Sequence, residues 1–219
     1  MTKVYDGTPN INVISNSLSG SISDDAVIAV GEPTSFSDKI VANNYSLTVT
    51  FSLTSSTGKE SNYYILGGNQ KSITNGSITA KQLTIADPTI TKSKEYDKTL
   101  TANTTAGTLS GVVTVGSATD VVTASAVGTY STSTVGTSKT ITVVYTLAGA
   151  DKDNYIKPVD KVYTDGVITA KQLTIADPTI TKSKEYDKIL TANVTAGTLS
   201  GVVTVGSATD AVTASAVGT

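Results

Sequence analysis

The sequence predicts an all-β chain, and both its composition and its turns point that way. Thr, Val, Ile and Tyr are prominent among the 219 residues, and β-branched and aromatic side chains suit a pleated, half-buried sheet better than a helix. Turn-forming pairs such as Ser19-Gly20, Asn75-Gly76 and Ser110-Gly111 separate short segments at roughly 8–12 residue spacing. We therefore expect small Ig-like β-sandwich units, with a β-grasp-like unit that contains one short helix as the alternative.

Alternation of apolar and polar residues identifies two of the expected strands. Along a strand, successive side chains point to opposite faces of the sheet. The later segment has an apolar face made by Ile141, Val143, Tyr145 and Leu147. The earlier segment repeats the pattern with Tyr45, Leu47, Val49, Phe51 and Leu53. We expect both apolar faces to be buried.

A long internal repeat sets the expected domain organisation. Residues 81–129 recur at 171–219 with a shift of 90, and only three of the 49 positions differ, at Thr99, Thr104 and Val121. The first 80 residues are a diverged copy. The prediction is three repeats of about 90 residues: 1–80, which lacks the leading strand, 81–170, which is complete, and 171–219, which is truncated.

Both ends of the chain are expected to fall inside a repeat, and two explanations are open. The simpler one is a fragment of a longer array of repeats. In the alternative, the open ends complement each other between chains, since a strand can be added to an unfilled sheet edge. Residues 166–175 join two repeats without a flexible Pro/Gly/Ser linker. Because short connections restrict bending between domains, we expect the repeats to form an elongated rod.

Missing residue types exclude several classes of function. The chain has no His and no Cys, and all 16 basic residues are Lys. Without His or Cys there is no Ser-His-Asp triad, no Cys-His nucleophile and no Cys/His zinc site, so we expect neither an enzyme nor a cofactor. A net charge of −2 without Arg argues against nucleic acid as a partner. No stretch approaches the roughly 18 apolar residues of a membrane span, and the first residues carry no export signal.

Several short motifs together resemble a known family of repeats. They are Val4-Tyr-Asp-Gly-Thr8, Lys94-Glu-Tyr-Asp-Lys-Thr99, Leu109-Ser-Gly111, Leu147-Ala-Gly-Ala-Asp151 with Asn154-Tyr155, and Gly166-Val-Ile-Thr-Ala170. In this order they resemble the YDG repeat, which is related to the MBG repeats of bacterial surface proteins. The resemblance covers essentially the whole chain. It implies tandem β-domains in a large secreted or cell-surface, adhesin-like protein, with no established catalytic residues.

The Tyr-Asp pair that gives the family its name occurs once in each copy. The second and third copies read Tyr-Asp-Lys, which weighs against a glycine-dependent left-handed turn at Lys98 and Lys188. In each copy we expect the Tyr to pack at a sheet edge with its hydroxyl bonded and the Asp to cap the following turn, rather than to contact a ligand. These motif residues are Tyr5, Asp6, Tyr96, Asp97, Tyr186 and Asp187.

One segment has the oxygen-rich composition of a calcium loop. Its candidate ligands are Asp151, Asp153 and Asn154. The segment lacks the Gly and the Glu that complete an EF-hand loop, so we expect a solvated loop, with calcium as the alternative. The acids at 24–25, which fall near Asp120 of the second copy, are likewise expected to be solvated.

The expected function is structural, because near-identical adjacent copies suit a spacer that needs only stability and reach. The resemblance implies a stalk that projects other domains from the bacterial cell surface, outside the cell, with neighbouring repeats as its partners. One alternative is an adhesive module that binds glycan or a host surface protein, for which Tyr63-Tyr64 is the aromatic pair best suited to stacking on sugar. The other alternative is a subunit of a self-assembling surface fibre.

Overall fold

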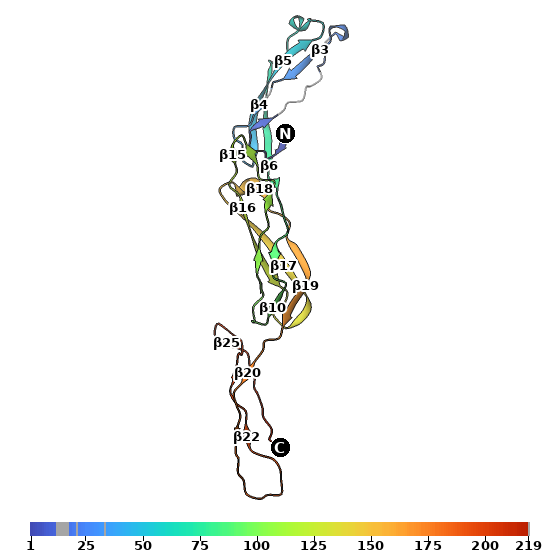
Figure 1. The fold of residues 1–219 in the computed structure, drawn as a ribbon. Coiled ribbons are helices and arrows are strands. Elements are labelled where there is room, and N and C mark those ends of the chain that lie inside the picture. Colours follow the sequence, from blue (N-terminus) through green and yellow to red (C-terminus); the bar gives the residue numbers. More distant parts are fainter. Residues whose placement is uncertain (12–17, 21, 33, 219) are drawn as a thin grey trace. The chain divides into compact units, whose positions relative to one another are not determined.

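The computed structural model describes residues 1–11, 18–20, 22–32 and 34–218, and nearly all of its regular structure is β-strand (Figure 1). Contacts divide the chain into two compact units. The long strands β16 (Thr123–Tyr130) and β17 (Gly136–Ala148) have residues in both. Unit 1 comprises residues 1–87, 107–125 and 146–159, and unit 2 comprises residues 88–106, 126–145 and 160–219.

Unit 1 contains a four-stranded sheet in the order β1-β6-β5-β3. β6 runs parallel to β1 and antiparallel to β5, which also pairs antiparallel with β3. On β5, Leu47 is 5% and Val49 is 1% exposed, so the centre of the predicted apolar face is buried. The bounds of these strands are β1 (Thr2–Val4), β3 (Val27–Gly31), β5 (Ala42–Ser55) and β6 (Gln70–Thr79).

Short strand pairs and 3-10 turns complete unit 1. The pairs are β2 (Asn10–Ile11) with β4 (Thr34–Ser35), β7 (Lys81–Gln82) with β18 (Tyr155–Ile156), β8 (Thr84–Ile85) with β13 (Leu109–Ser110), and β14 (Thr114–Val115) with β15 (Ala118–Thr119). The turns are η1 (Ser23–Asp25), η2 (Glu60–Asn62) and η3 (Lys152–Asn154). One buried cluster joins Tyr5 and Ile78 of the first predicted repeat to Leu83, Val113 and Tyr155 of the second. Two repeats therefore share a core.

Unit 2 contains a five-stranded sheet in the order β10-β19-β17-β16-β11. β10 runs parallel to β19, and β19 runs antiparallel to β17, as β1, β6 and β5 do in unit 1. Ile141 and Val143 on β17 are 0% exposed and Tyr145 is 1% exposed, which confirms the apolar face predicted for this segment. The remaining bounds are β10 (Ser93–Glu95), β11 (Thr101–Ala102) and β19 (Lys161–Thr169).

The short strand pairs of the near-identical segments have the same register in both copies. Adding 90 to the residue numbers converts each pair of the second repeat into one of the third. The pair β9 (Thr89–Ile90) with β12 (Thr104–Thr105) corresponds to β21 (Thr179–Ile180) with β22 (Val194–Thr195). The pairs β8–β13 and β14–β15 correspond to β20 (Thr174–Ile175) with β23 (Leu199–Ser200) and to β24 (Thr204–Val205) with β25 (Ala208–Thr209).

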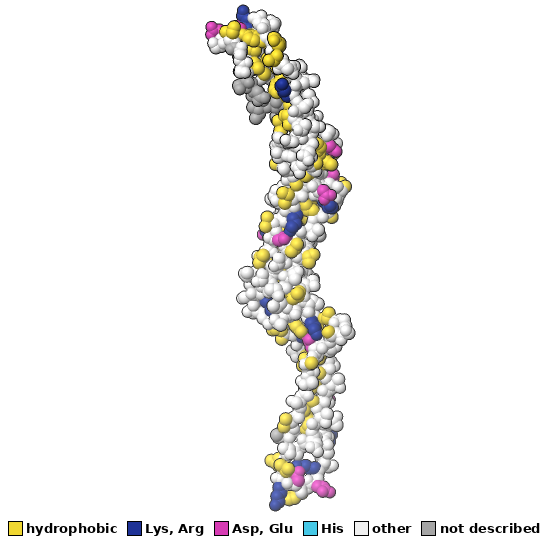
Figure 2. All heavy atoms as spheres, turned by 180° about the vertical axis from the view of Figure 1, so that it is seen from behind, with side chains coloured by type: hydrophobic (Ala, Val, Ile, Leu, Met, Phe, Trp, Pro, Cys, Tyr) yellow, Lys and Arg dark blue, Asp and Glu magenta, His cyan; other side chains and the backbone are white. Residues whose placement is uncertain are grey.

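The prediction of an all-β chain with a tandem-repeat layout is confirmed. Within the described ranges no α-helix occurs, so the helix of the β-grasp-like alternative is not found there. The contact-based units cross the repeat boundaries, which stay sequence-based predictions, as does the rod. Figure 2 shows a face that is largely uncharged, with Lys and acidic side chains spread in small groups.

Candidate functional site

Each copy of the Tyr-Asp pair lies in a tight turn that a lysine two residues before the Tyr holds together. In the first copy, Lys3 Nζ donates to Asp6 Oδ1 at 2.8 Å and to the carbonyl oxygens of Thr8 and Asn10 at 2.9 and 2.8 Å. The backbone N–H of Thr8 also donates to Asp6 Oδ1, at 2.9 Å. This is the geometry of a turn cap. We call residues 3–8, 94–99 and 184–189 the first, second and third Tyr-Asp turns.

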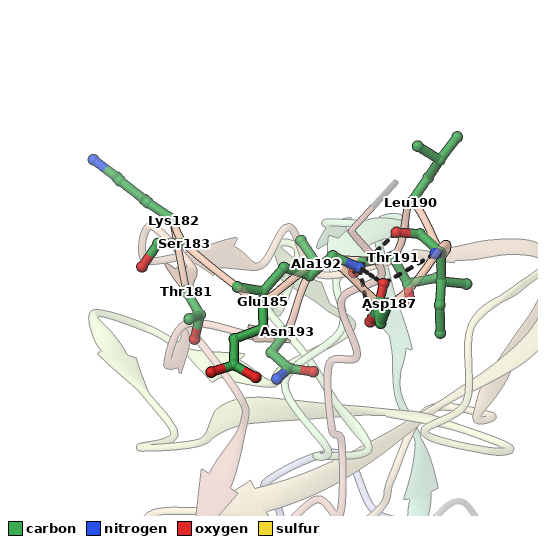
Figure 3. Close-up of a pocket in the computed structure, with 11 residues that line it drawn as sticks. Thr181, Lys182, Ser183, Glu185, Asp187, Leu190, Thr191, Ala192 and Asn193 are labelled. Atoms are coloured by element: carbon green, nitrogen blue, oxygen red, sulfur yellow. Dashed lines mark hydrogen bonds and ion pairs between the residues drawn. The ribbon is translucent and has the colours of Figure 1, made fainter.

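The second and third Tyr-Asp turns share the lysine and backbone N–H contacts of the aspartate with the first. Lys94 Nζ donates to Asp97 Oδ1 at 2.7 Å, and Asp97 Oδ1 accepts the N–H of Thr99 at 2.9 Å. In the third turn, Lys184 Nζ and the N–H of Ile189 both donate to Asp187 Oδ1 at 2.9 Å. Figure 3 shows these contacts of Asp187 beside an open hollow of about 530 Å³. The contacts recur in three surroundings, so they belong to the motif itself.

The aspartates of the three turns have pKa values below the usual range. Burial alone would raise the pKa of Asp6 and of Asp97, but hydrogen bonds from the turn lysine and threonine outweigh it. At Asp187, the N–H of the residue two positions on is the largest cause of the lowered pKa, followed by the lysine. All three carboxylates are therefore ionised at neutral pH and remain acceptors in their turns.

The residue after each aspartate has a left-handed backbone. Its φ is +78° at Gly7, +66° at Lys98 and +65° at Lys188. The sequence weighed against this conformation at the two lysines, yet both adopt it. A left-handed residue other than Gly costs about 1–2 kcal/mol, and the hydrogen bonds that Lys94 and Asp97 make inside the second turn offset that cost, at about 1 kcal/mol each.

The tyrosine of the first turn reaches into the second repeat. Tyr5 Oη donates to Asp120 Oδ2 at 2.7 Å, and Tyr155 Oη donates to the same oxygen at 2.6 Å. The N–H of Val113 donates to Tyr155 Oη at 2.9 Å. The two rings meet edge to face with centroids 5.4 Å apart, and Tyr5 and Tyr155 are 2% and 7% exposed. We call Tyr5, Asp120 and Tyr155 the first junction.

Both tyrosines of the first junction remain protonated far into the alkaline range. Burial is the largest cause, and the hydrogen bond to Asp120 adds to it. Together they raise the pKa of Tyr155 to about 12 and raise the pKa of Tyr5 further. The junction therefore consists of one carboxylate shared by two phenol donors, an arrangement that fixes two chain segments.

A second junction of related design lies in unit 2 and is formed by Tyr96, Lys98 and Asp210. The hydroxyl of Tyr96 faces the carboxylate of Asp210, and Lys98 Nζ lies 2.9 Å from Asp210 Oδ1. The lysine is the largest cause of the lowered pKa of Asp210, followed by the tyrosine. Asp210 is Asp120 shifted by 90. The same position in two repeats thus faces the tyrosine of the preceding repeat.

Two further tyrosines, one in the first repeat and one in the third Tyr-Asp turn, have different surroundings. In the first repeat, Tyr63 Oη donates to Asp25 Oδ2 at 2.5 Å and accepts the N–H of Ile22 at 3.2 Å, which is the pattern of the tyrosine and valine at the first junction. The prediction that Asp25 is a merely solvated acid is therefore wrong. At the other extreme, Tyr186 of the third turn is 88% exposed.

The three residues predicted as calcium ligands make separate contacts. Asp151 Oδ2 accepts the N–H of Val121 at 2.8 Å, and the buried Asn154 accepts the N–H of Val41 at 3.0 Å through Oδ1. Asp153 has 86% of its side chain exposed. In the part of the chain that the structure describes, no three acidic, His or Cys side chains are grouped to hold a metal. Calcium at this segment stays the untested alternative to a loop without a metal.

Sequence reasoning missed the acceptors of the tyrosine hydroxyls. Asp120 follows a hairpin and has the sequence context of an ordinary loop acid, 115 residues away from Tyr5. One available signal was its recurrence as Asp210, beside a position that differs between the copies. Recurrence alone does not name a partner, because almost every residue of these copies recurs.

Comparison with known proteins places most of the chain in one family. The YDG domain model matches residues 1–73 and 79–163, which include the first two Tyr-Asp turns and all of the first junction. No curated protein and no solved structure matches the chain. Among the described residues, no helix has the length and apolar character needed to cross a membrane.

Proposed function

The chain belongs to the YDG domain family, and on that basis we propose that it is a stalk, a series of spacer repeats that projects other domains from a bacterial cell surface. The junctions carry this proposal. In each unit, the tyrosine of one repeat's turn faces an aspartate of the following repeat; Tyr5 donates to Asp120 at 2.7 Å, and Lys98 pairs with Asp210 beside Tyr96. Consecutive repeats are then joined by packed and hydrogen-bonded contacts, which a spacer needs in order to keep its reach.

The chemistry of the first junction also favours a structural role. Two buried tyrosine hydroxyls are committed to Asp120, and the pKa of Tyr155 is raised to about 12. Catalytic groups instead tend to have pKa values matched to a proton transfer near neutral pH. Such a cluster stabilises a contact between segments and does not supply a poised acid, base or nucleophile.

Small-angle X-ray scattering of the chain tests the stalk. A compact body of 219 residues has a radius of gyration of roughly 17 Å, whereas repeats joined end to end approach roughly 30 Å. The stalk predicts the larger value. A matched chain with a second copy of residues 81–170 inserted should be longer by one further repeat length. A compact value, or an insertion that leaves the maximum dimension unchanged, contradicts the proposal.

An adhesive module that binds glycan is a second candidate function, favoured by exposed apolar side chains in the first repeat. Tyr64 and Leu66 are each 83% exposed, and an exposed aromatic ring suits stacking on a sugar. Binding to a glycan array that Tyr64→Ala abolishes would support this function. Ile156→Ala is the matched control, because Ile156 holds the corresponding position in the second repeat and should not affect binding.

A further inference from the structure

Tyr155 closes the first junction by filling a slot between two repeats. Its strand β18 pairs parallel with β7, and the N–H of Leu83 donates to the carbonyl oxygen of Ile156 at 3.1 Å. Immediately before it, Asn154 Oδ1 accepts the N–H of Val41 at 3.0 Å. The Asn-Tyr segment is therefore held by the side chains of Asn154 and Tyr155 and by backbone hydrogen bonds.

Unit 2 contains an open pocket of about 150 Å³ whose walls match that slot. On one wall, three lining residues lie at the positions that surround Tyr155 in unit 1, shifted by 90. These residues are Leu173, Val203 and Asp210, which correspond to Leu83, Val113 and Asp120.

The opposite wall of the pocket matches as well. Tyr96 takes the place of Tyr5, since the hydroxyl of each faces the aspartate of the following repeat. Val135 takes the place of Val41, because the residue that follows each valine has the same strand partner. Gly136 pairs with Ile168 of β19, and Ala42 pairs with Ile78, the corresponding residue of β6. The pocket is thus built from the same parts as the slot that holds Tyr155.

The pocket has the groups that bind the Asn-Tyr strand in unit 1, but no strand of the described chain lies over them, so they are more exposed. Leu83 is 1% exposed, whereas Leu173 is only half-buried. Gln82 and Gln172 each donate through Nε2 to the carbonyl oxygen of the next residue at 2.9 Å, and Gln82 Nε2 also donates to the carbonyl oxygen of Lys157 at 2.8 Å. Two phenol hydroxyls donate to Asp120 at the first junction, whereas Asp210 faces only the hydroxyl of Tyr96 among the tyrosines of its pocket.

We propose that this pocket is an acceptor site for an extended Asn-Tyr segment of a repeat of this kind, with the sequence of residues 151–157. The tyrosine ring fills the pocket, and its hydroxyl donates to Asp210 and accepts the N–H of Val203. The asparagine amide oxygen accepts the N–H of Val135, and the segment pairs with the backbone at 171–172. This mode of recognition is strand addition, in which main-chain hydrogen bonds supply affinity and a side-chain pocket supplies specificity.

A labelled peptide titrated into the full chain tests the site. The peptide has the sequence Ala-Asp-Lys-Asp-Asn-Tyr-Ile-Lys-Pro of residues 150–158, and fluorescence anisotropy reports binding. We expect saturable binding of one peptide per chain. With Phe in place of the Tyr, the peptide loses a hydrogen bond to a charged acceptor and should bind about 10-fold more weakly. With Ala at that position, binding should be lost.

Three variants locate the bound peptide on the chain. Asp210→Asn should weaken binding about 10-fold, and Val203→Arg, which fills the pocket, should abolish it. Asp120→Asn is the matched control, because Tyr155 already occupies that site and peptide affinity should not change. Circular dichroism verifies that each variant keeps its sheet content.

Three results would overturn the acceptor site. The first is no saturable binding to the native chain. The second is an Ala peptide that binds as tightly as the native peptide, and the third is an Asp120→Asn variant that weakens binding as much as Asp210→Asn. The last result would place the peptide in the slot of Tyr155 and not in the pocket of unit 2.

Discussion

At the first junction Tyr5 is 2% exposed and Asp120 accepts two phenol hydroxyls. At the second junction Tyr96 is half-buried, and Asp210 pairs with a lysine and faces one phenol. The aspartates lie in segments that differ at only three of 49 positions. What differs is the Asn-Tyr strand, which is present at one junction and absent from the other. Burial at a junction is therefore set by the partner strand more than by the local sequence.

Removing the tyrosine that closes the first junction should have the largest effect. Tyr155→Ala takes a buried ring away and should lower the free energy of unfolding by about 3–5 kcal/mol. Urea unfolding followed by circular dichroism measures it. Ile156→Ala is the control on the same strand, and because Ile156 is 49% exposed it should cost less than about 1 kcal/mol. Equal losses would show that Tyr155 does not close the junction.

The second largest effect is expected at the aspartates, because removing Asp120 should cost more stability than removing Asp210. Asp120→Ala leaves two buried hydroxyls without their acceptor and should cost about 2–3 kcal/mol. Asp210→Ala removes a group whose side chain is 24% exposed, so its loss should stay below about 1 kcal/mol. The same urea experiment on both variants makes the comparison. If the two losses were equal, the first junction would not be the more tightly closed one.

Exchanging the left-handed residues, Gly7 for Lys and Lys98 for Gly, should destabilise the first junction and leave the second nearly unchanged. A Cβ on Gly7 would lie 2.7 Å from Val115 Cγ2 and 2.9 Å from Val113 Cγ1, so Gly7→Lys should destabilise by about 2 kcal/mol. Lys98→Gly gives up its ion pair with Asp210 but relieves the left-handed strain, and we expect a net change within about 1 kcal/mol. Thermal melts of both variants test this asymmetry, which a neutral Gly7→Lys would refute.

High pH should also weaken the first junction. The pKa of Tyr155 is raised from its ordinary value to about 12 in the folded chain, while an unfolded tyrosine ionises near pH 10. A raised pKa stabilises the fold below about pH 10, and that contribution is lost as the pH rises toward about 12. Tyr155→Phe removes this titration, so between pH 10 and 12 it should lose less stability than the native chain. An identical pH profile for the two would exclude Tyr155 as a source of alkaline lability.

Much of the fold was predictable because strand periodicity is a local property. Ile141, Val143 and Tyr145 alternate with polar neighbours, and the structure buries all three. The acceptor of Tyr5 was not predictable in this way, because Asp120 approaches it only after the chain has folded over 115 residues. A short local pattern has no information about such a tertiary contact.

The turn at Lys98 shows a different limit of prediction. Its sequence lacks the glycine that usually permits a positive φ, and this absence argued against the conformation that the structure has. The deciding interactions are the hydrogen bonds of Asp97 with Lys94 and Thr99. These hydrogen bonds are local. However, the conformational preference of each residue by itself does not tell whether together they outweigh the strain of a positive φ at Lys98.

The shared core of unit 1 has a consequence for cooperativity. Tyr5 and Ile78 lie in the same buried cluster as Leu83, Val113 and Tyr155, so each of the first two repeats completes the interior of the other. Stability in such an array depends on nearest-neighbour coupling, as in a one-dimensional chain of interacting elements. Melting should then begin at the terminal repeats, which have a neighbour on one side only, and move inward. Each repeat added to an array should raise the stability of those already present until the interior repeats dominate.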